Sequence, residues 1–163
     1  MPAPSVRHPG RRADSDIAVF TTLTDQRATW RVGHEARRRD CFDYVQGCTW
    51  ALAQAGVAVP GCDVAIASSI PAGSGLSSSA ALAVAVLRAF RELLGLAFDD
   101  RTLAGLAHRA EVEFVGAPVG LMDPLAVSLA AEGSALHLDT RTLVTTRVPL
   151  PERAELAVIG PGG

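Results

Sequence analysis

The sequence predicts an α+β domain built from a sheet and a set of helices. The chain has 163 residues, 48% of them hydrophobic, which is enough to bury one core. Residues 62–68 alternate polar and apolar side chains as a strand does, whereas Leu82, Val86 and Leu93 belong to an apolar face at helical spacing. Both periodicities occur in this one chain, and a glycine- and serine-rich loop lies between them.

The composition excludes several classes of partner. The net charge is −2 and no basic stripe with interleaved aromatic residues is present, so we expect no nucleic-acid partner. No apolar run is long enough to cross a bilayer, and residues 1–16 lack the apolar stretch of a signal peptide. We therefore expect a cytoplasmic protein without a membrane partner. The 3 cysteines have no C-x-x-C spacing, which indicates reduced packing residues.

The N-terminal part predicts a disordered segment, a hairpin and a helix. Residues 1–16 are rich in proline, arginine and aspartate without an apolar period, so we interpret them as a disordered lead-in. Residues 17–22 and 28–32 are rich in β-branched and aromatic side chains and predict a hairpin. The three arginines at 37–39 favour a solvated surface over a phosphate grip, and residues 41–56 predict a helix.

The C-terminal half predicts further helices and strands. One helix follows the glycine-rich loop and ends at Gly95, and another covers residues 99–114. The chain then bends over residues 116–120 before a short helix that begins near Asp123. Strands are predicted over residues 134–138, 143–148 and 155–159.

The stretch from Ser69 to Phe90 organises the chain. Its glycines allow tight turns and close approach to a ligand, and the first turn of the following helix offers free N–H groups and the positive end of a dipole. Such a loop fits an anion, and a serine hydroxyl there can reach a magnesium ion that accompanies a nucleotide phosphate. The alternative is that Ser77 to Ser79 only cap a buried helix. The chain contains no lysine, so the loop is not a Walker A motif.

Two motifs taken together resemble a known family. PAGSGLSSSAAL, at residues 71–82, is similar to the second motif of the GHMP kinases, in which such a loop wraps the ATP phosphates at a helix N-terminus. GAPVGLMDP, at residues 116–124, makes the chain most similar to the galactokinases. The resemblance implies an incomplete, two-layer sheet-and-helix lobe of the ribosomal protein S5 domain 2-like type. Residues 17–163 would then form part of a GHMP kinase N-terminal, ATP-binding domain.

The resemblance also implies roles for individual residues. It implies ATP and Mg²⁺ as cofactors and a small sugar, with galactose as the first candidate, as the acceptor of the phosphate. Asp123 matches the residue described as the catalytic base beside the sugar's anomeric hydroxyl, and Gly120 matches a position where the backbone passes close to the sugar. Ser79, preferred over Ser78, and Glu111 match the metal ligands. The implied nucleotide-binding set is Pro71, Gly73, Ser74, Gly75, Leu76, Ser77, Ser78 and Ser79.

On pattern alone these residues have structural alternatives. An aspartate that opens a helix is commonly an N-cap, which applies to Asp123. A glutamate late in a helix commonly faces solvent, and we interpret Glu113 as such a residue. The 4 histidines show no metal-ligand spacing and are interpreted as incidental.

The sequence departs from the galactokinase pattern in ways that affect the chemistry. The family's G-R-x-N-x-x-G-E-H-x-D-Y motif, whose side chains clamp the sugar, is missing, and Gly33-His34-Glu35 has the wrong order and position. A third glycine-rich motif would fall beyond Gly163, and Pro124 stands where glutamine is usual. Because an unoriented acceptor loses much of the rate that positioning provides, we expect a truncated galactokinase product whose own activity is impaired.

Three hypotheses follow from these observations. The first is a galactokinase-type transferase that makes galactose 1-phosphate from ATP. The second is a non-catalytic fragment or sensor that binds a nucleotide or sugar. The third is a kinase for a related sugar such as arabinose. The sequence does not predict the oligomeric state.

Overall fold

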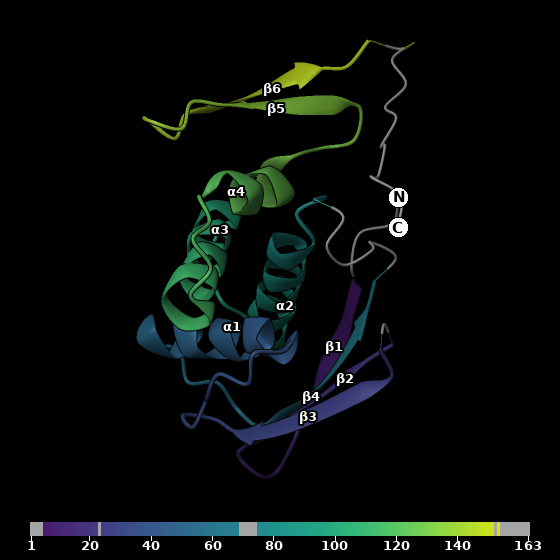
Figure 1. The fold of residues 1–163 in the computed structure, drawn as a ribbon, viewed down its shortest axis with the longest axis vertical. Coiled ribbons are helices and arrows are strands. Elements are labelled where there is room, and N and C mark those ends of the chain that lie inside the picture. The colour runs from purple at the N-terminus through teal and green to yellow at the C-terminus, as the bar shows by residue number, and fades with distance from the viewer. Residues whose placement is uncertain (1–4, 23, 69–74, 152, 154–163) are drawn as a thin grey trace.

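Strands and helices form separate layers in the computed structural model, which describes residues 5–22, 24–68, 75–151 and 153 (Figure 1). The main sheet has the strand order β1-β4-β2-β3, with β1 (Ser5–Arg11), β2 (Asp16–Thr21), β3 (Gln26–Arg31) and β4 (Cys62–Ala67). The helical layer contains α1 (Phe42–Gln54), α2 (Ser78–Leu94), α3 (Asp100–Arg109), the π-helical turn η1 (Ala110–Val115) and α4 (Met122–Leu129). A separate hairpin of β5 (Ser134–Leu138) and β6 (Thr145–Pro149) lies beyond α4. The α+β prediction is confirmed.

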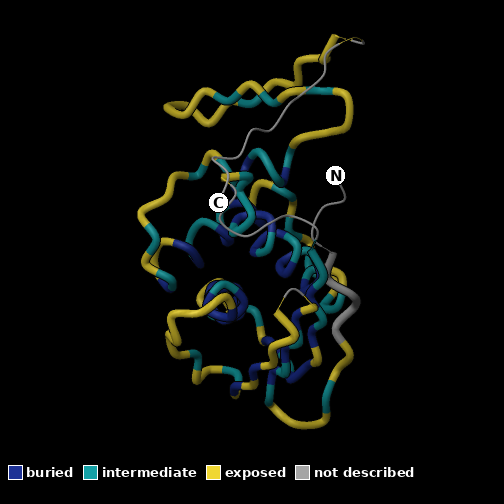
Figure 2. Tube along the Cα trace, turned by 45° about the vertical axis from the view of Figure 1, so that its right-hand side comes forward, coloured by how far each residue is buried: buried dark blue, intermediate teal, exposed yellow. Residues whose placement is uncertain are grey.

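The main sheet combines parallel and antiparallel pairing. β2 runs antiparallel to β3 and parallel to β4, with Val19 opposite Val64. Alternate side chains, such as Ile17 and Val19 in β2 and Val64 and Ile66 in β4, are buried, as the period of two in a strand requires. Figure 2 shows the buried residues concentrated in the helices and in the strands beside them. One face of the sheet therefore packs against the helical layer.

The structure corrects the prediction of a disordered lead-in over residues 1–16. Ser5–Arg11 pairs antiparallel with β4, and the pairing register shifts between Arg7 and Gly10. Pro9 lies within this shift, where its missing N–H removes no regular ladder bond. A strand held by main-chain hydrogen bonds needs no apolar alternation in its sequence. Strand β1 could therefore not be predicted from the composition of this segment.

Most other predicted elements lie close to their expected positions. The predicted hairpin is β2 and β3, the helix over residues 41–56 is α1, and the helix over residues 99–114 is α3 followed by η1. The strand predicted over residues 155–159 lies outside the described residues. Among the described residues, no helix is both long and apolar enough to span a membrane.

The helix boundaries have local causes. The Asp99 carboxylate accepts a hydrogen bond from the Thr102 N–H at 2.7 Å and so caps the start of α3. Gly95 ends α2 in a left-handed conformation with φ of 62°, which glycine adopts without steric cost. On the apolar face of α2, Val84, Leu87 and Phe90 are fully buried, while Leu82 and Leu93 are partly buried. These signals could be read from the sequence because they depend on neighbouring residues.

Gly47 allows a close approach between α1 and η1, and this contact can be tested. A Cβ atom at Gly47 would lie 3.1 Å from the Cβ and O atoms of Ala110 and 3.3 Å from Cδ1 of Phe114. Gly47→Val should therefore lower the free energy of unfolding by about 1–3 kcal/mol, the usual cost of overpacking. Urea unfolding measures the difference.

The matched control is Gly105→Ala within α3. A Cβ atom there would meet nothing within 4 Å, so alanine should raise stability by up to about 1 kcal/mol through its higher helix propensity. Equal effects of the two substitutions would show that the contact at Gly47 is not tight.

Candidate functional site

Two residues with left-handed backbone conformations precede α2. Gly75 has φ of 70° and Ser77, the N-cap residue, has φ of 54°. This conformation costs a non-glycine residue roughly 1–3 kcal/mol and recurs at ligand-binding turns. The Ser77 side chain makes no capping hydrogen bond, so the structure does not support the alternative in which this serine is only a cap. Pro71, Gly73 and Ser74 lie outside the described residues.

Glu111 is buried close to the first turn of α2. Its exposed fraction is 1%, and its carboxylate accepts a hydrogen bond from the Ser79 hydroxyl. The other oxygen, Oε1, has no hydrogen-bond partner among the described residues. The expectation for a late-helix glutamate holds for Glu113 instead, which is exposed and pairs with Arg109 at 3.0 Å.

The π-helical turn η1 sets the position of Glu111. The backbone carbonyl of Glu111 accepts a hydrogen bond from the Ala117 N–H at 2.9 Å, and this bond closes a turn wider than that of an α-helix. Such turns are rare and are frequently found at functional sites. The helical periodicity in the sequence did not predict this change in pitch.

The electrostatics around Glu111 favour a bound cation. Burial raises the pKa of Glu111, the Ser79 hydrogen bond lowers it, the charge of Asp123 raises it and that of His108 lowers it. A second carboxylate nearby and low solvent exposure both oppose ionisation. A positive charge at this place would stabilise the ionised carboxylate and so offset both effects.

Asp123 lies in the first turn of α4 and is partly buried. The N-cap of α4 is Leu121, so Asp123 is not the capping residue that the structural alternative required. The preceding loop is held by the carbonyl of Val119, which lies 3.2 Å from Nε2 of His108. His108, interpreted from spacing as incidental, therefore contacts the loop that leads to Asp123.

The fold thus places the Ser79 hydroxyl of α2 in hydrogen-bond contact with Glu111 of η1, and Asp123 of α4 near enough for its charge to raise the pKa of Glu111. Ser78 opens α2 and is partly buried, and Gly120 is exposed in the bend before α4. No group of three or more histidine, cysteine, aspartate and glutamate side chains that would hold a metal ion occurs within the described ranges. Any metal here therefore depends on ligands of other kinds as well.

A cleft of about 380 Å³ lies near this cluster, and the sequence did not predict it. Tyr44 lines this cleft, and burial and then the charge of Glu111 raise the pKa of Tyr44. The lining comes from the segment before α1, from α1 itself and from η1, which meet only in the folded chain. The lining residues are Arg37, Arg39, Asp40, Cys41, Asp43, Tyr44 and Val115.

The three arginines beside this cleft are exposed, as the interpretation of a solvated surface expects, and this segment also makes specific contacts. Buried Asp43 accepts hydrogen bonds from the N–H groups of Arg38 and Arg39, at 2.7 and 2.8 Å. The Arg37 guanidinium donates to the carbonyl of Phe114 in η1. The available signal was Asp43 itself, since a carboxylate at a helix start commonly binds nearby N–H groups.

Comparison with known families adds to this geometry. Residues 43–131 match the GHMP kinases N terminal domain. The chain belongs to the GHMP kinase family. The matched span contains Ser79, Glu111 and Asp123.

The curated relatives of this GHMP kinase chain include galactokinases. The chain is 46% identical over 112 residues to the galactokinase of Streptomyces coelicolor and 42% identical over 120 residues to that of Thermococcus kodakarensis. These matches cover 69% and 74% of this chain but 29% and 34% of the relatives. The chain therefore spans about a third of the length of these relatives.

Solved structures show the same fold. The galactokinase of Lactococcus lactis, in complex with galactose, matches with a TM-score of 0.82 and 25% identity, over 91% of this chain and 39% of that one. The mevalonate kinase of Methanococcus jannaschii matches with a TM-score of 0.68 and 16% identity, over 89% and 45%. The second likeness concerns the fold alone. The predicted GHMP kinase lobe is confirmed.

The raised pKa of Glu111 predicts how stability depends on pH. The folded chain holds this proton more tightly than the unfolded chain, so the contribution of Glu111 to stability should fall as pH rises from 4.5, the ordinary value, through the folded pKa. Each unit of difference between the two pKa values amounts to about 1.4 kcal/mol. Glu111→Gln removes this titration, so the variant should be more stable than wild type at pH 8. Thermal and urea unfolding from pH 4 to pH 8 measure the difference.

The matched control is Glu113→Gln. The pKa of Glu113 is lowered by its hydrogen bond with Arg109, so this variant should lose rather than gain stability at high pH. A Glu111→Gln variant that is less stable than wild type at pH 8 would contradict the burial of an ionisable carboxylate.

Proposed function

We propose that this GHMP kinase chain supplies the nucleotide- and magnesium-binding part of a galactokinase-type enzyme, which transfers the γ-phosphate of ATP to the anomeric hydroxyl of galactose. The observation that carries the proposal is the convergence of Ser79, Glu111 and Asp123. Phosphoryl transfer depends chiefly on positioning the reactants and neutralising charge. Galactose enters through the likeness to galactokinases, one of which is solved in complex with that sugar.

The donors at this place fit Mg²⁺. That ion prefers oxygen ligands, keeps several waters, and is usually bound through one or two carboxylates together with substrate phosphates. Glu111 offers an oxygen that is buried and lacks a hydrogen-bond partner among the described residues, next to the Ser79 hydroxyl. An unsatisfied buried acceptor is costly, and a cation at this place would satisfy it. When bound, the ion would help neutralise the phosphate charges.

The start of α2 is the proposed holder of the phosphates. The N–H groups of a first helical turn have no acceptor within the helix, and the helix dipole adds positive potential there. The left-handed conformations of Gly75 and Ser77 turn the chain sharply into this helix. Gly75, Leu76, Ser77, Ser78 and Ser79 are the described part of the nucleotide-binding set, and we propose that Pro71, Gly73 and Ser74 complete it.

Asp123 is the proposed base for the acceptor hydroxyl, with Gly120 beside the sugar. A carboxylate within reach of the hydroxyl can take its proton as the phosphate is transferred, which typically contributes 10²–10⁴-fold in rate.

Asp123→Asn should therefore lower galactose-dependent ADP release by about 100-fold or more, while Mg-ATP binding stays close to wild type. A coupled ADP-release assay and calorimetric titration measure the two quantities.

The outcomes of this test separate the hypotheses. If wild type binds Mg-ATP but releases no ADP with galactose or arabinose, the chain acts as a nucleotide-binding module. If a folded preparation does not bind Mg-ATP, the proposed function is wrong.

The cleft near the cluster is the proposed place for the nucleoside. Tyr44 offers an aromatic surface there, and base stacking on an aromatic ring is worth roughly 1–3 kcal/mol. Tyr44→Ala should weaken Mg-ATP binding by about tenfold, which corresponds to about 1.4 kcal/mol. Inorganic tripolyphosphate lacks a nucleoside, so its affinity should be unchanged in the variant. An equal loss for both ligands would place the nucleoside elsewhere.

A further inference from the structure

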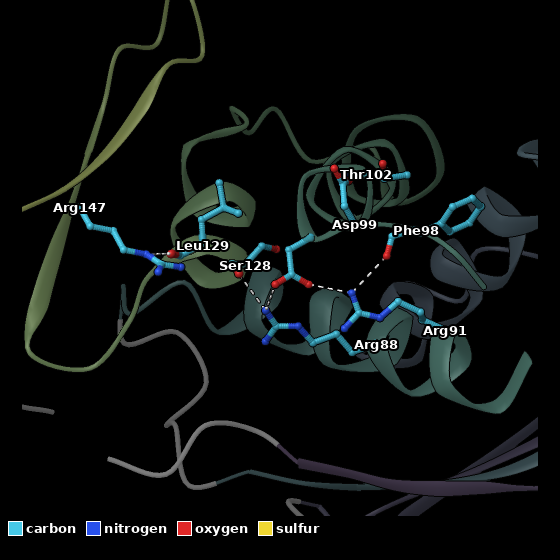
Figure 3. A network of polar contacts seen from close by, with 9 residues as sticks. Arg88, Arg91, Phe98, Asp99, Thr102, Ser128, Leu129 and Arg147 are labelled. Carbon is cyan, nitrogen blue, oxygen red and sulfur yellow. Dashed lines mark hydrogen bonds and ion pairs between the residues drawn. The ribbon is translucent and has the colours of Figure 1, made fainter. Parts of the chain in front are cut away.

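The short helix α4 is held at its C-terminal end by two arginines. It has only 8 residues, which is too short for stability in isolation. The last carbonyls of a helix have no intrahelical partner. In α4, the Ser128 carbonyl accepts a hydrogen bond from Nη2 of Arg88 at 2.8 Å, and the Leu129 carbonyl accepts one from Nε of Arg147 at 3.1 Å (Figure 3). Cations at this end also complement the helix dipole.

Arg88 connects α4 with two other helices. The side chain belongs to α2, and its Nη2 atom also lies 3.3 Å from Oδ2 of Asp100 at the start of α3. The second oxygen of Asp100 pairs with Nη1 of Arg91 at 2.8 Å. One guanidinium therefore links α2, which carries Ser79 in its first turn, with α4, which carries Asp123.

Arg91 provides a natural comparison. It lies on α2 one turn after Arg88. Its Nη1 atom donates to the Asp100 carboxylate at 2.8 Å and to the carbonyl of Phe98 at 3.3 Å (Figure 3). Within the part of the chain that the structure describes, none of its hydrogen bonds reaches α4. The two arginines share the ion pair with Asp100 and differ in the bond to Ser128.

We propose that Arg88 is a positioning residue that fixes α4, and with it Met122 and Asp123, relative to the start of α2. Asp123 precedes Ser128 by five residues, which is about 7.5 Å along a helix, so a shift at one end moves the other. A displacement of about 1 Å can cost about 10²-fold in rate. The consequence for phosphate transfer rests on the proposed function, whereas the placement of α4 does not.

The test of placement uses Met122, which is next to Asp123 and 57% exposed. The chain has 2 methionines, so selective ¹³C-methyl labelling yields two signals, which Met122→Leu assigns. Without nucleotide, Arg88→Gln should shift or broaden the Met122 signal. Arg91→Gln should leave that signal unchanged, although both variants weaken the pairing with Asp100 and should lower Tm similarly.

Two further variants keep the test decisive. Arg88→Lys retains a cationic donor near the Ser128 carbonyl. The position and width of its Met122 signal should therefore lie close to those of wild type. Asp100→Asn removes the ion pair but keeps the bond from Arg88 to Ser128, so it should leave the signal as in wild type. An unchanged signal in folded Arg88→Gln, or an equal change in Arg91→Gln or Asp100→Asn, overturns the proposal.

Measurements of kcat and of the Kd for Mg-ATP distinguish the positioning role of Arg88 from the proposed function. Where wild type transfers phosphate to galactose, Arg88→Gln should lower kcat by roughly 10–100-fold and leave the Kd for Mg-ATP within about twofold, while Arg91→Gln keeps kcat. Parallel losses of kcat and affinity would point to general loss of structure and overturn the positioning role. If wild type neither binds Mg-ATP nor turns over, the proposed function fails, and the methyl signals still decide the role of Arg88.

Discussion

The constraint on which the rest of this structure depends is a carboxylate kept away from water where three helical segments meet. Glu111 is 1% exposed, its carboxylate accepts a hydrogen bond from the Ser79 hydroxyl, and the charge of Asp123 raises its pKa. Burying an ionisable group without a matching charge is unfavourable. A domain selected only for stability would place an apolar side chain there. The cost is understandable in a GHMP kinase chain if the site exists to receive a cation and the phosphates that come with it.

The surrounding fold provides the rigidity that this site needs. Glu111 leaves α3 on a π-helical turn, and that turn is packed against α1 at Gly47, where the missing side chain lets the two backbones approach. At the far end of the helical layer, Arg88 and Asp100 join α2, α3 and α4 through charged hydrogen bonds. The unfavourable features, the left-handed backbone of Ser77 and the buried carboxylate of Glu111, are therefore confined to the site. Ordinary packing and ion pairs elsewhere hold its three segments in place.

The helical segments and the sheet have different roles in this chain. Residues 43–131, which match the GHMP kinases N terminal domain, contain the whole cluster of Ser79, Glu111 and Asp123. The sheet contributes no side chain to this cluster; its strands supply the buried face on which α1 and α2 rest. The sugar-clamping motif expected from the galactokinase resemblance is missing from the sequence. The cluster of Ser79, Glu111 and Asp123 is the part of the chain for which we propose nucleotide and metal binding.

The sequence by itself determined those features that depend on neighbours along the chain. Richness in β-branched and aromatic residues predicted β2 and β3, alternation predicted β4, helical spacing predicted the apolar face of α2, Asp99 marked the start of α3, and two short motifs indicated the family. The family resemblance singled out Glu111 and the pattern assigned Glu113 to the surface, but only the tertiary structure decided that Glu111 is buried beside Ser79, because that depends on what packs against it. It also decided that residues 5–11 form a strand, that the arginine run contacts η1, and that a cleft lies beside Tyr44. Each of these depends on contacts between segments distant in sequence, and such contacts leave no periodic signal in either partner.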